Sequence, residues 1–143
     1  MMEKEYFRDN RDKRDKCDDR DKKGLLKKKS YAFAIRIVKM TWYLQEDKNE
    51  RVLSKQVLRS GTSIGALVRE AEFAQSTADF VHKLNVALKE ANETDYWLNL
   101  LKDTGYISED AFESIHSDCK ELIAMFVSSI KTLKMKISNP NNF

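Results

Sequence analysis

The chain has 143 residues, of which 41% are hydrophobic, and this is enough apolar material for one domain with a single core. Its formal net charge is +3, and its one proline and four glycines are too few turn residues for a sheet protein. No apolar run approaches the ~20 residues of a membrane-spanning helix, and the N-terminus is too charged for a signal peptide. We therefore expect an all-α protein that binds no membrane. Because Cys17 and Cys119 form no metal or disulfide pattern, we expect it in the cytoplasm.

Residues 1–24 are predicted to form a charged, low-complexity arm. Residues 1–29 carry twelve basic and eight acidic side chains, whereas the rest of the chain carries fourteen and fifteen. Such a segment cannot drive burial, so a solvated extension is the simplest interpretation. The alternative is a nucleic-acid-binding arm that contacts phosphates. The candidate residues for that role are Arg11, Arg14, Arg20, Lys22, Lys23, Lys27, Lys28 and Lys29.

The next segment, residues 25–45, has two apolar stripes at helical spacing. One stripe consists of Tyr31, Ala34, Ile35, Val38 and Trp42; the other consists of Phe33, Ile37, Met40 and Leu44. Together they exceed what a single core can cover, so part of this surface should meet another subunit or the N-terminal arm. We predict that the second stripe, Phe33, Ile37, Met40 and Leu44, is the oligomer interface.

A second helix is predicted over 50–74, capped by Asp47 or Asn49. It contains Gly61 and Gly65, each of which costs ~1 kcal/mol relative to alanine inside a helix. That cost favours close packing against a neighbouring helix, with a bend or a ligand contact as alternatives. The predicted packing residues are Ser60, Gly61, Ile64 and Gly65.

Two further helices are predicted over 76–103 and 108–136. Ser76 and Ser108 stand at their N-cap positions, and Gly105 ends the first of them. Four long helices with short connections predict an antiparallel up-down-up-down four-helix bundle over 25–138, followed by a tail at 139–143.

Catalytic and metal-binding residues are hard to find in this pattern. Asp79 and Glu113 each precede a histidine by three residues, His82 and His116, as in di-iron bundles. His82 and Glu113 point away from the apolar stripes, whereas His116 lies at the edge of one. The two pairs also fall at opposite ends of the bundle, so we predict no metal. Cys119 lies on an apolar stripe, where a cysteine is inert. We therefore expect no enzyme, no cofactor and no small-molecule substrate.

Charged and aromatic side chains in the middle of the chain are better explained by packing. Glu70, Glu90 and Glu93 are expected to form ion pairs with Arg59, Arg69 or Lys89 rather than to act as acids or bases. Trp42, Tyr96 and Trp97 are expected to be core or interface anchors rather than platforms for nucleic-acid bases.

One stretch carries a specific family resemblance. It runs Arg59-Ser-Gly-Thr-Ser-Ile-Gly-Ala66 and follows Gln56; after it come Glu70-Ala71, Ala74, Ser76, Asp79-Phe80, Lys83-Leu84, Ala87, Lys89-Glu-Ala91, Glu93-Thr94 and Tyr96-Trp-Leu98. This pattern resembles the bacterial four-helix-bundle family of proteins encoded within 23S rRNA intervening sequences. The chain departs from this pattern at Leu67, where the family usually has asparagine. Whatever role the asparagine side chain has in the family therefore cannot be transferred to this chain. The resemblance implies a homo-oligomer, most often a pentameric ring, with no established enzymatic activity.

Two functions follow as expectations. The first is a non-enzymatic, homo-oligomeric interaction or scaffold protein. The second is a nucleic-acid-binding accessory protein, because the resemblance extends to the accessory proteins of diversity-generating retroelements, which partner a reverse transcriptase and bind RNA or DNA through a basic surface. The near-neutral bundle predicted here makes the second role harder to transfer.

Overall fold

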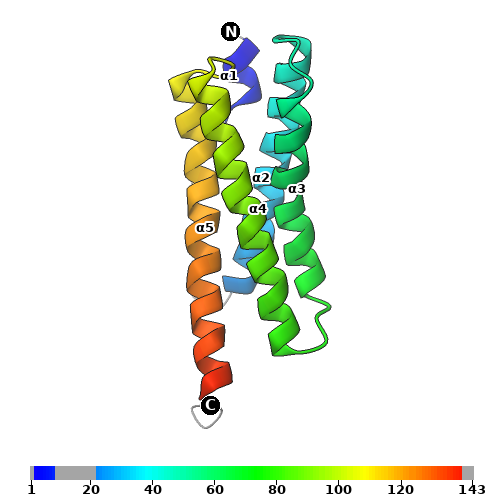
Figure 1. Cartoon of the computed structure of the whole chain (residues 1–143), viewed down its shortest axis with the longest axis vertical. Helices are drawn as coiled ribbons and strands as arrows, with labels where there is room; N and C mark the ends of the chain where they lie inside the picture. The colour runs from blue at the N-terminus through cyan, green and yellow to red at the C-terminus, as the bar shows by residue number, and fades with distance from the viewer. Residues whose placement is uncertain (1, 9–21, 140–143) are drawn as a thin grey trace.

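The computed structural model describes residues 2–8 and 22–139, whose regular structure is helical, with no strand among them (Figure 1). A short helix, α1 (Met2–Tyr6), precedes four long helices: α2 (Lys22–Glu46), α3 (Leu53–Ala71), α4 (Thr77–Asp103) and α5 (Glu109–Ser138). The bounds of the four long helices agree with the predicted segments to within three residues. None of the described helices combines the length and apolar character that crossing a bilayer requires.

The N-cap residues predicted from the sequence are confirmed for two of three helices. The hydroxyl of Ser76 accepts a hydrogen bond from the Asp79 amide at 3.1 Å, and Ser108 caps α5 in the same way. The predicted cap of α3 by Asp47 or Asn49 is wrong. The Glu50 carboxylate instead accepts hydrogen bonds from the amides of residues 52, 53 and 54 at 2.7–2.9 Å. Three orphan amides of α3 are thus satisfied by one side chain.

The four long helices lie side by side around one apolar core (Figure 1). We call these four helices the bundle. The start of α2 lies beside the end of α3, where Lys27 and Glu72 form an ion pair of 3.1 Å. The start of α5 lies beside the end of α4, where the ammonium of Lys102 sits 4.2 Å from the Phe112 ring centroid. We call the end where α2 begins and α5 ends the lower end, as Figure 1 draws it.

The core uses the stripe of α2 that the sequence assigned to a second subunit. Phe33 is 1% exposed, and Ile37, Met40 and Leu44 are fully buried within the single chain. These four residues cannot contact another copy unless the bundle opens. The other stripe is the exposed one, because Tyr31, Ile35 and Trp42 are 58%, 42% and 50% exposed. Both stripes have helical spacing and apolar composition, so spacing could not distinguish them.

The small residues of α3 lie against α2. A Cβ atom added at Gly61 would lie 2.8 Å from Cγ1 of Ile37, and one at Gly65 would lie 3.3 Å from the main-chain oxygen of Ser30. Ser60 and Ile64 are fully buried beside them. Both glycines are therefore positions where another helix approaches closely.

The N-terminal arm is corrected in part. Residues 2–8 are packed on the bundle rather than solvated, since Phe7 is 6% exposed, and α2 already begins at Lys22. The remainder of the predicted arm, with Arg11, Arg14 and Arg20, lies outside the described residues, as does the tail beyond Asn139.

Candidate interaction surfaces

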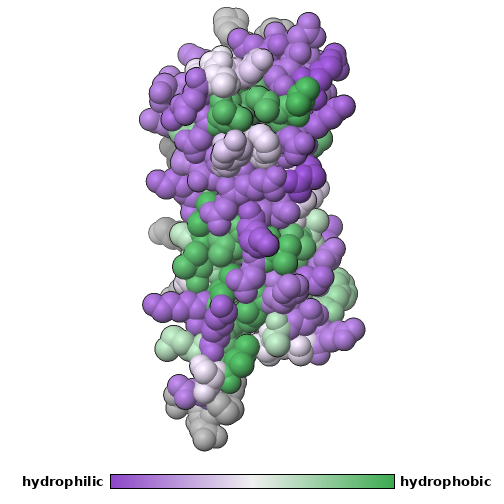
Figure 2. All heavy atoms as spheres, in the orientation of Figure 1, coloured by the Kyte–Doolittle hydropathy of each residue, from purple (hydrophilic) through white to green (hydrophobic). Residues whose placement is uncertain are grey.

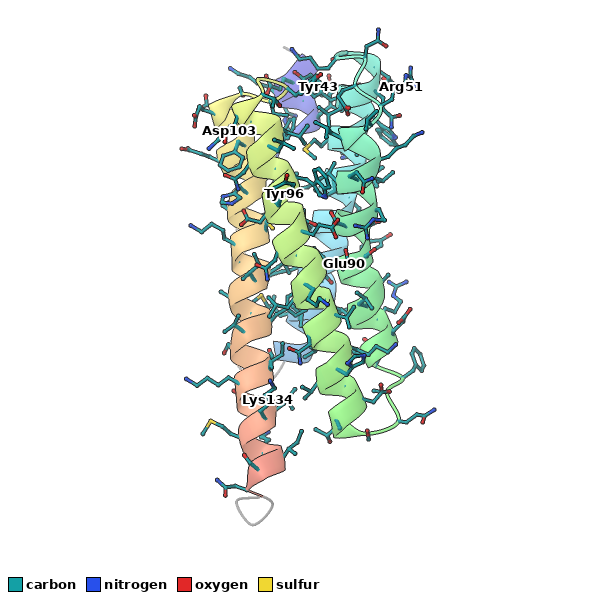
Figure 3. The ribbon with its side chains drawn as sticks, in the orientation of Figure 1. Tyr43, Arg51, Glu90, Tyr96, Asp103 and Lys134 are labelled. Carbon is teal, nitrogen blue, oxygen red and sulfur yellow. The ribbon has the colours of Figure 1, made fainter. Side chains whose placement is uncertain are left out.

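The family-like stretch forms the contact between α3 and α4. The guanidinium of Arg59 pairs with Glu90 at 3.3 Å and with Glu93, and Lys83 pairs with Glu70 at 3.3 Å. Deeper in the same contact, Thr94 donates a hydrogen bond to the Ser60 hydroxyl at 2.9 Å. Figure 3 shows Glu90 on the side of α4 that faces α3. The residues that carry the resemblance therefore hold two helices together.

The electrostatics of this contact suit ion pairing rather than proton transfer. The hydrogen bond from Arg59 lowers the pKa of Glu93, outweighing the desolvation that opposes it, and Trp97 donates a second bond to the same carboxylate. A carboxylate with a lowered pKa stays charged near neutral pH and is a poor general base. Among the described residues, neither Lys89 nor Arg69 forms an ion pair with these glutamates. Arg69 instead lies 5.7 Å from the Tyr31 ring centroid.

The residues considered for catalysis are not arranged for it. Cys119 is fully buried, and burial, with a smaller contribution from nearby carboxylates, raises the pKa of its thiol to about 12. His116 contacts Asp95 on α4 and stacks on Phe112 at 4.4 Å between ring centroids. His82 is exposed on α4, far from this pair in sequence. Within residues 2–8 and 22–139, no three His, Cys, Asp or Glu side chains are placed to hold a metal ion.

Two apolar surfaces formed by the described residues are candidates for contact with a partner. The first lies on α2 and is formed by exposed Tyr31, Ile35 and Trp42 with half-buried Val38 among them. These residues follow one another at intervals of four, three and four and so share one side of the helix. We call it the α2 stripe. A chain folded alone would place aromatic side chains of this size in contact with water along three turns of helix.

The second surface is a shallow groove between the lower halves of α4 and α5. Leu88, Val127, Ile130 and Met135 line its apolar part, and its volume is about 390 Å³. Figure 2 shows apolar side chains gathered over this part of the two helices, between polar bands. We call it the α4/α5 groove.

Three of the eight basic residues predicted to bind nucleic acid have interaction partners within the chain. Lys27 pairs with Glu72, Lys29 pairs with Glu121, and Lys28 also has an interaction partner. Lys22 and Lys23 belong to the first turn of α2. These pairings reduce the positive charge that α2 offers to phosphate.

The sequence reasoning missed a second basic group at the same end. Lys131, Lys134 and Lys136 lie on the exposed last turns of α5, and Figure 3 labels Lys134 there. Glu121 is the last acidic residue of the chain, so nothing beyond it in sequence balances these lysines. This run without acidic residues could have been recognised in the sequence. The sequence does not show that the end of α5 lies close to the start of α2, where Lys136 and Gly24 line the same hollow.

Comparison with known proteins agrees with this geometry. The family model described as 23S rRNA-intervening sequence protein matches residues 22–128. A crystal structure of a protein of unknown function from the S23 ribosomal protein family of Bacteroides thetaiotaomicron VPI-5482 is 55% identical, with a TM-score of 0.76. The similarity covers 77% of this chain and 98% of that one. No curated protein matches the chain. The chain therefore belongs to the 23S rRNA-intervening sequence protein family.

Proposed function

We propose that this protein is a non-enzymatic interaction protein that assembles with further copies of itself. The α2 stripe is the observation that carries the proposal, because Tyr31, Ile35 and Trp42 are about half exposed on a helix whose opposite side is fully buried. Full burial of an exposed large apolar side chain is favourable by ~1.5–3 kcal/mol, so covering the exposed half of each of these would gain about half of that. The bundle itself is of the antiparallel up-down-up-down type. The ion pair between the start of α2 and the end of α3, and the contact of Lys102 near the end of α4 with Phe112 near the start of α5, support this.

In this assembly, the α2 stripe of one copy packs into the α4/α5 groove of the next copy. The stripe is a ridge of aromatic and branched side chains, and the groove is a concave apolar surface on two different helices. A contact between unlike surfaces leaves a free stripe on one copy and a free groove on the other, so assembly continues until a ring closes. A pentameric ring, which the family resemblance implies, is the expected closed form.

Self-association is tested by substituting the stripe. Trp42→Glu should reduce the mass measured by light scattering from a multiple of 16.7 kDa, five for a pentamer, to that of one chain. Phe73→Glu is the matched control, because Phe73 is 82% exposed but lies outside the stripe, in the connection after α3. A mass near 16.7 kDa for the unsubstituted chain at micromolar concentration would refute the proposal.

Nucleic-acid binding is a second candidate, favoured by the lysines that gather at the lower end. Lys131, Lys134 and Lys136 lie on the exposed last turns of α5, near the start of α2, and in a ring several copies would add their charge. Such an accessory protein would bind RNA or DNA phosphates, in partnership with a reverse transcriptase, and its affinity would fall steeply with salt.

This candidate is tested by anisotropy titration with structured RNA and duplex DNA at low salt. Replacing Lys131, Lys134 and Lys136 by glutamine should weaken binding and flatten its salt dependence. The control replaces Arg51 and Lys55, two exposed basic residues near the start of α3, and should leave binding unchanged. Absence of salt-sensitive binding by the unsubstituted chain would rule the candidate out.

A further inference from the structure

A buried arginine lies between the upper halves of α2 and α5, at the base of the site occupied by the N-terminal segment. Arg36 is 8% exposed and donates hydrogen bonds to the carboxylate of Asp118 at 2.7 Å and to the main-chain oxygen of Ser114 at 3.0 Å. Its second terminal nitrogen donates to the Ser114 hydroxyl at 2.6 Å and to the main-chain oxygen of Phe7 at 2.8 Å. One guanidinium therefore joins α2, α5 and the N-terminal segment.

The other contacts of residues 2–8 have the character of ligand recognition. The carboxylate of Glu3 accepts a hydrogen bond from the main-chain amide of Ser108 at 2.8 Å, at the N-terminus of α5. The rings of Tyr6 and Phe7 pack at 5.8 and 6.0 Å from the ring of Tyr43, and Phe7 is buried. Figure 3 shows Tyr43 beside α1 at the upper end. The segment is thus held by one carboxylate, one main-chain carbonyl and two aromatic rings.

The receptor and the segment differ in their relation to the family. Arg36, Tyr43, Ser108, Ser114 and Asp118 all lie within residues 22–128, which the family model matches, whereas residues 2–8 lie outside it. The similarity to the solved relative covers 98% of that protein but only 77% of this chain. A bundle of this type therefore folds from a shorter chain than this one. The site that receives the segment therefore belongs to the bundle, and the segment is an addition to it.

We propose that the bundle carries a peptide-binding groove between the upper halves of α2 and α5, and that this chain's own residues 2–8 occupy it as an intramolecular ligand. The groove recognises a short helix with a carboxylate near its start and an adjacent pair of aromatic residues at its end. Residues 9–21, which join the segment to α2, would span about 45 Å if fully extended. The axial distance from Lys22 to Tyr43 along α2 is about 32 Å, so a connection of this length can reach the groove.

Hydrogen exchange in the full chain tests the proposal, with the exchange rate of the Ser108 amide as the readout. Phe7→Ala should release the segment and accelerate that exchange by roughly tenfold or more, since the variant loses a buried aromatic side chain. Glu5→Ala is the matched control, because Glu5 is exposed on the same short helix and should leave the rate unchanged.

A synthetic peptide of residues 2–8 then distinguishes a ligand from an integral part of the core. Tethering corresponds to an effective concentration of about millimolar, so the peptide at several millimolar should restore slow exchange to the Phe7→Ala chain. The same peptide with alanine in place of its phenylalanine should not. Failure of the peptide to restore protection would overturn the proposal, as would global unfolding of the Phe7→Ala chain on a thermal melt.

Discussion

Replacing Gly61 by alanine tests how closely α3 and α2 are packed. The new Cβ atom would lie 2.8 and 2.9 Å from the two γ carbons of Ile37 and 3.2 Å from its δ carbon. Ile37 is fully buried and β-branched, so it has little freedom to turn aside. The alanine gains ~1 kcal/mol in helix propensity, but overpacking a core costs ~1–3 kcal/mol. We expect a net destabilisation of up to about 2 kcal/mol.

A double-mutant cycle with Ile37→Ala isolates the steric cost. That substitution removes all three atoms that the new Cβ would meet, at its own cost of ~2–5 kcal/mol. In the Ile37→Ala background, Gly61→Ala should stabilise the chain by ~1 kcal/mol, because only the propensity gain remains. Urea unfolding at a fixed protein concentration measures both effects. An equal effect of Gly61→Ala in the two backgrounds would refute the reasoning.

Three further predictions follow from burial and hydrogen bonding. Gly65→Leu should lower the thermal midpoint, because its Cβ alone would lie 3.3 Å from the main-chain oxygen of Ser30, which cannot rotate away; an unchanged midpoint would contradict this. Burial raises the pKa of the Glu50 carboxyl, but its bonds to three main-chain amides outweigh this and bring the pKa below that of an ordinary glutamate. The stabilisation is therefore present above the ordinary glutamate pKa and is lost as the pH falls through the lower folded-state pKa, so Glu50→Gln should flatten the fall in thermal midpoint over that acidic range. An equally steep fall in the variant would count against the cap. In a Cys17→Ser chain, Cys119 should resist thiol reagents at pH 8 until urea unfolds the bundle, since its thiol is buried with a pKa of about 12; rapid labelling of the folded chain would be inconsistent with that burial.

The helices and most of their ends were predictable because the signals are local. A serine just before a helix caps it when its hydroxyl accepts a hydrogen bond from the main-chain amide three residues later. Ser76 and Ser108 both do this. The α3 cap was missed because a glutamate that bends back to three amides is not distinguished by spacing from an ordinary exposed acid. The ion pairs of Arg59 with Glu90 and Glu93 were predicted, because these residues were expected to pair rather than to act as acids or bases.

The sequence by itself determined that the protein is helical, that four long helices carry apolar stripes and that small residues of α3 allow a close approach. Only the tertiary structure decided which stripe of α2 is buried, because Phe33, Ile37, Met40 and Leu44 have the same spacing and character as the exposed stripe and differ only in what packs against them. The docking of residues 2–8 was likewise a tertiary decision. Its donors and acceptors, Glu3 with Ser108 and Phe7 with Arg36, are far apart in sequence, and no local pattern records a hydrogen bond that exists only when distant segments meet.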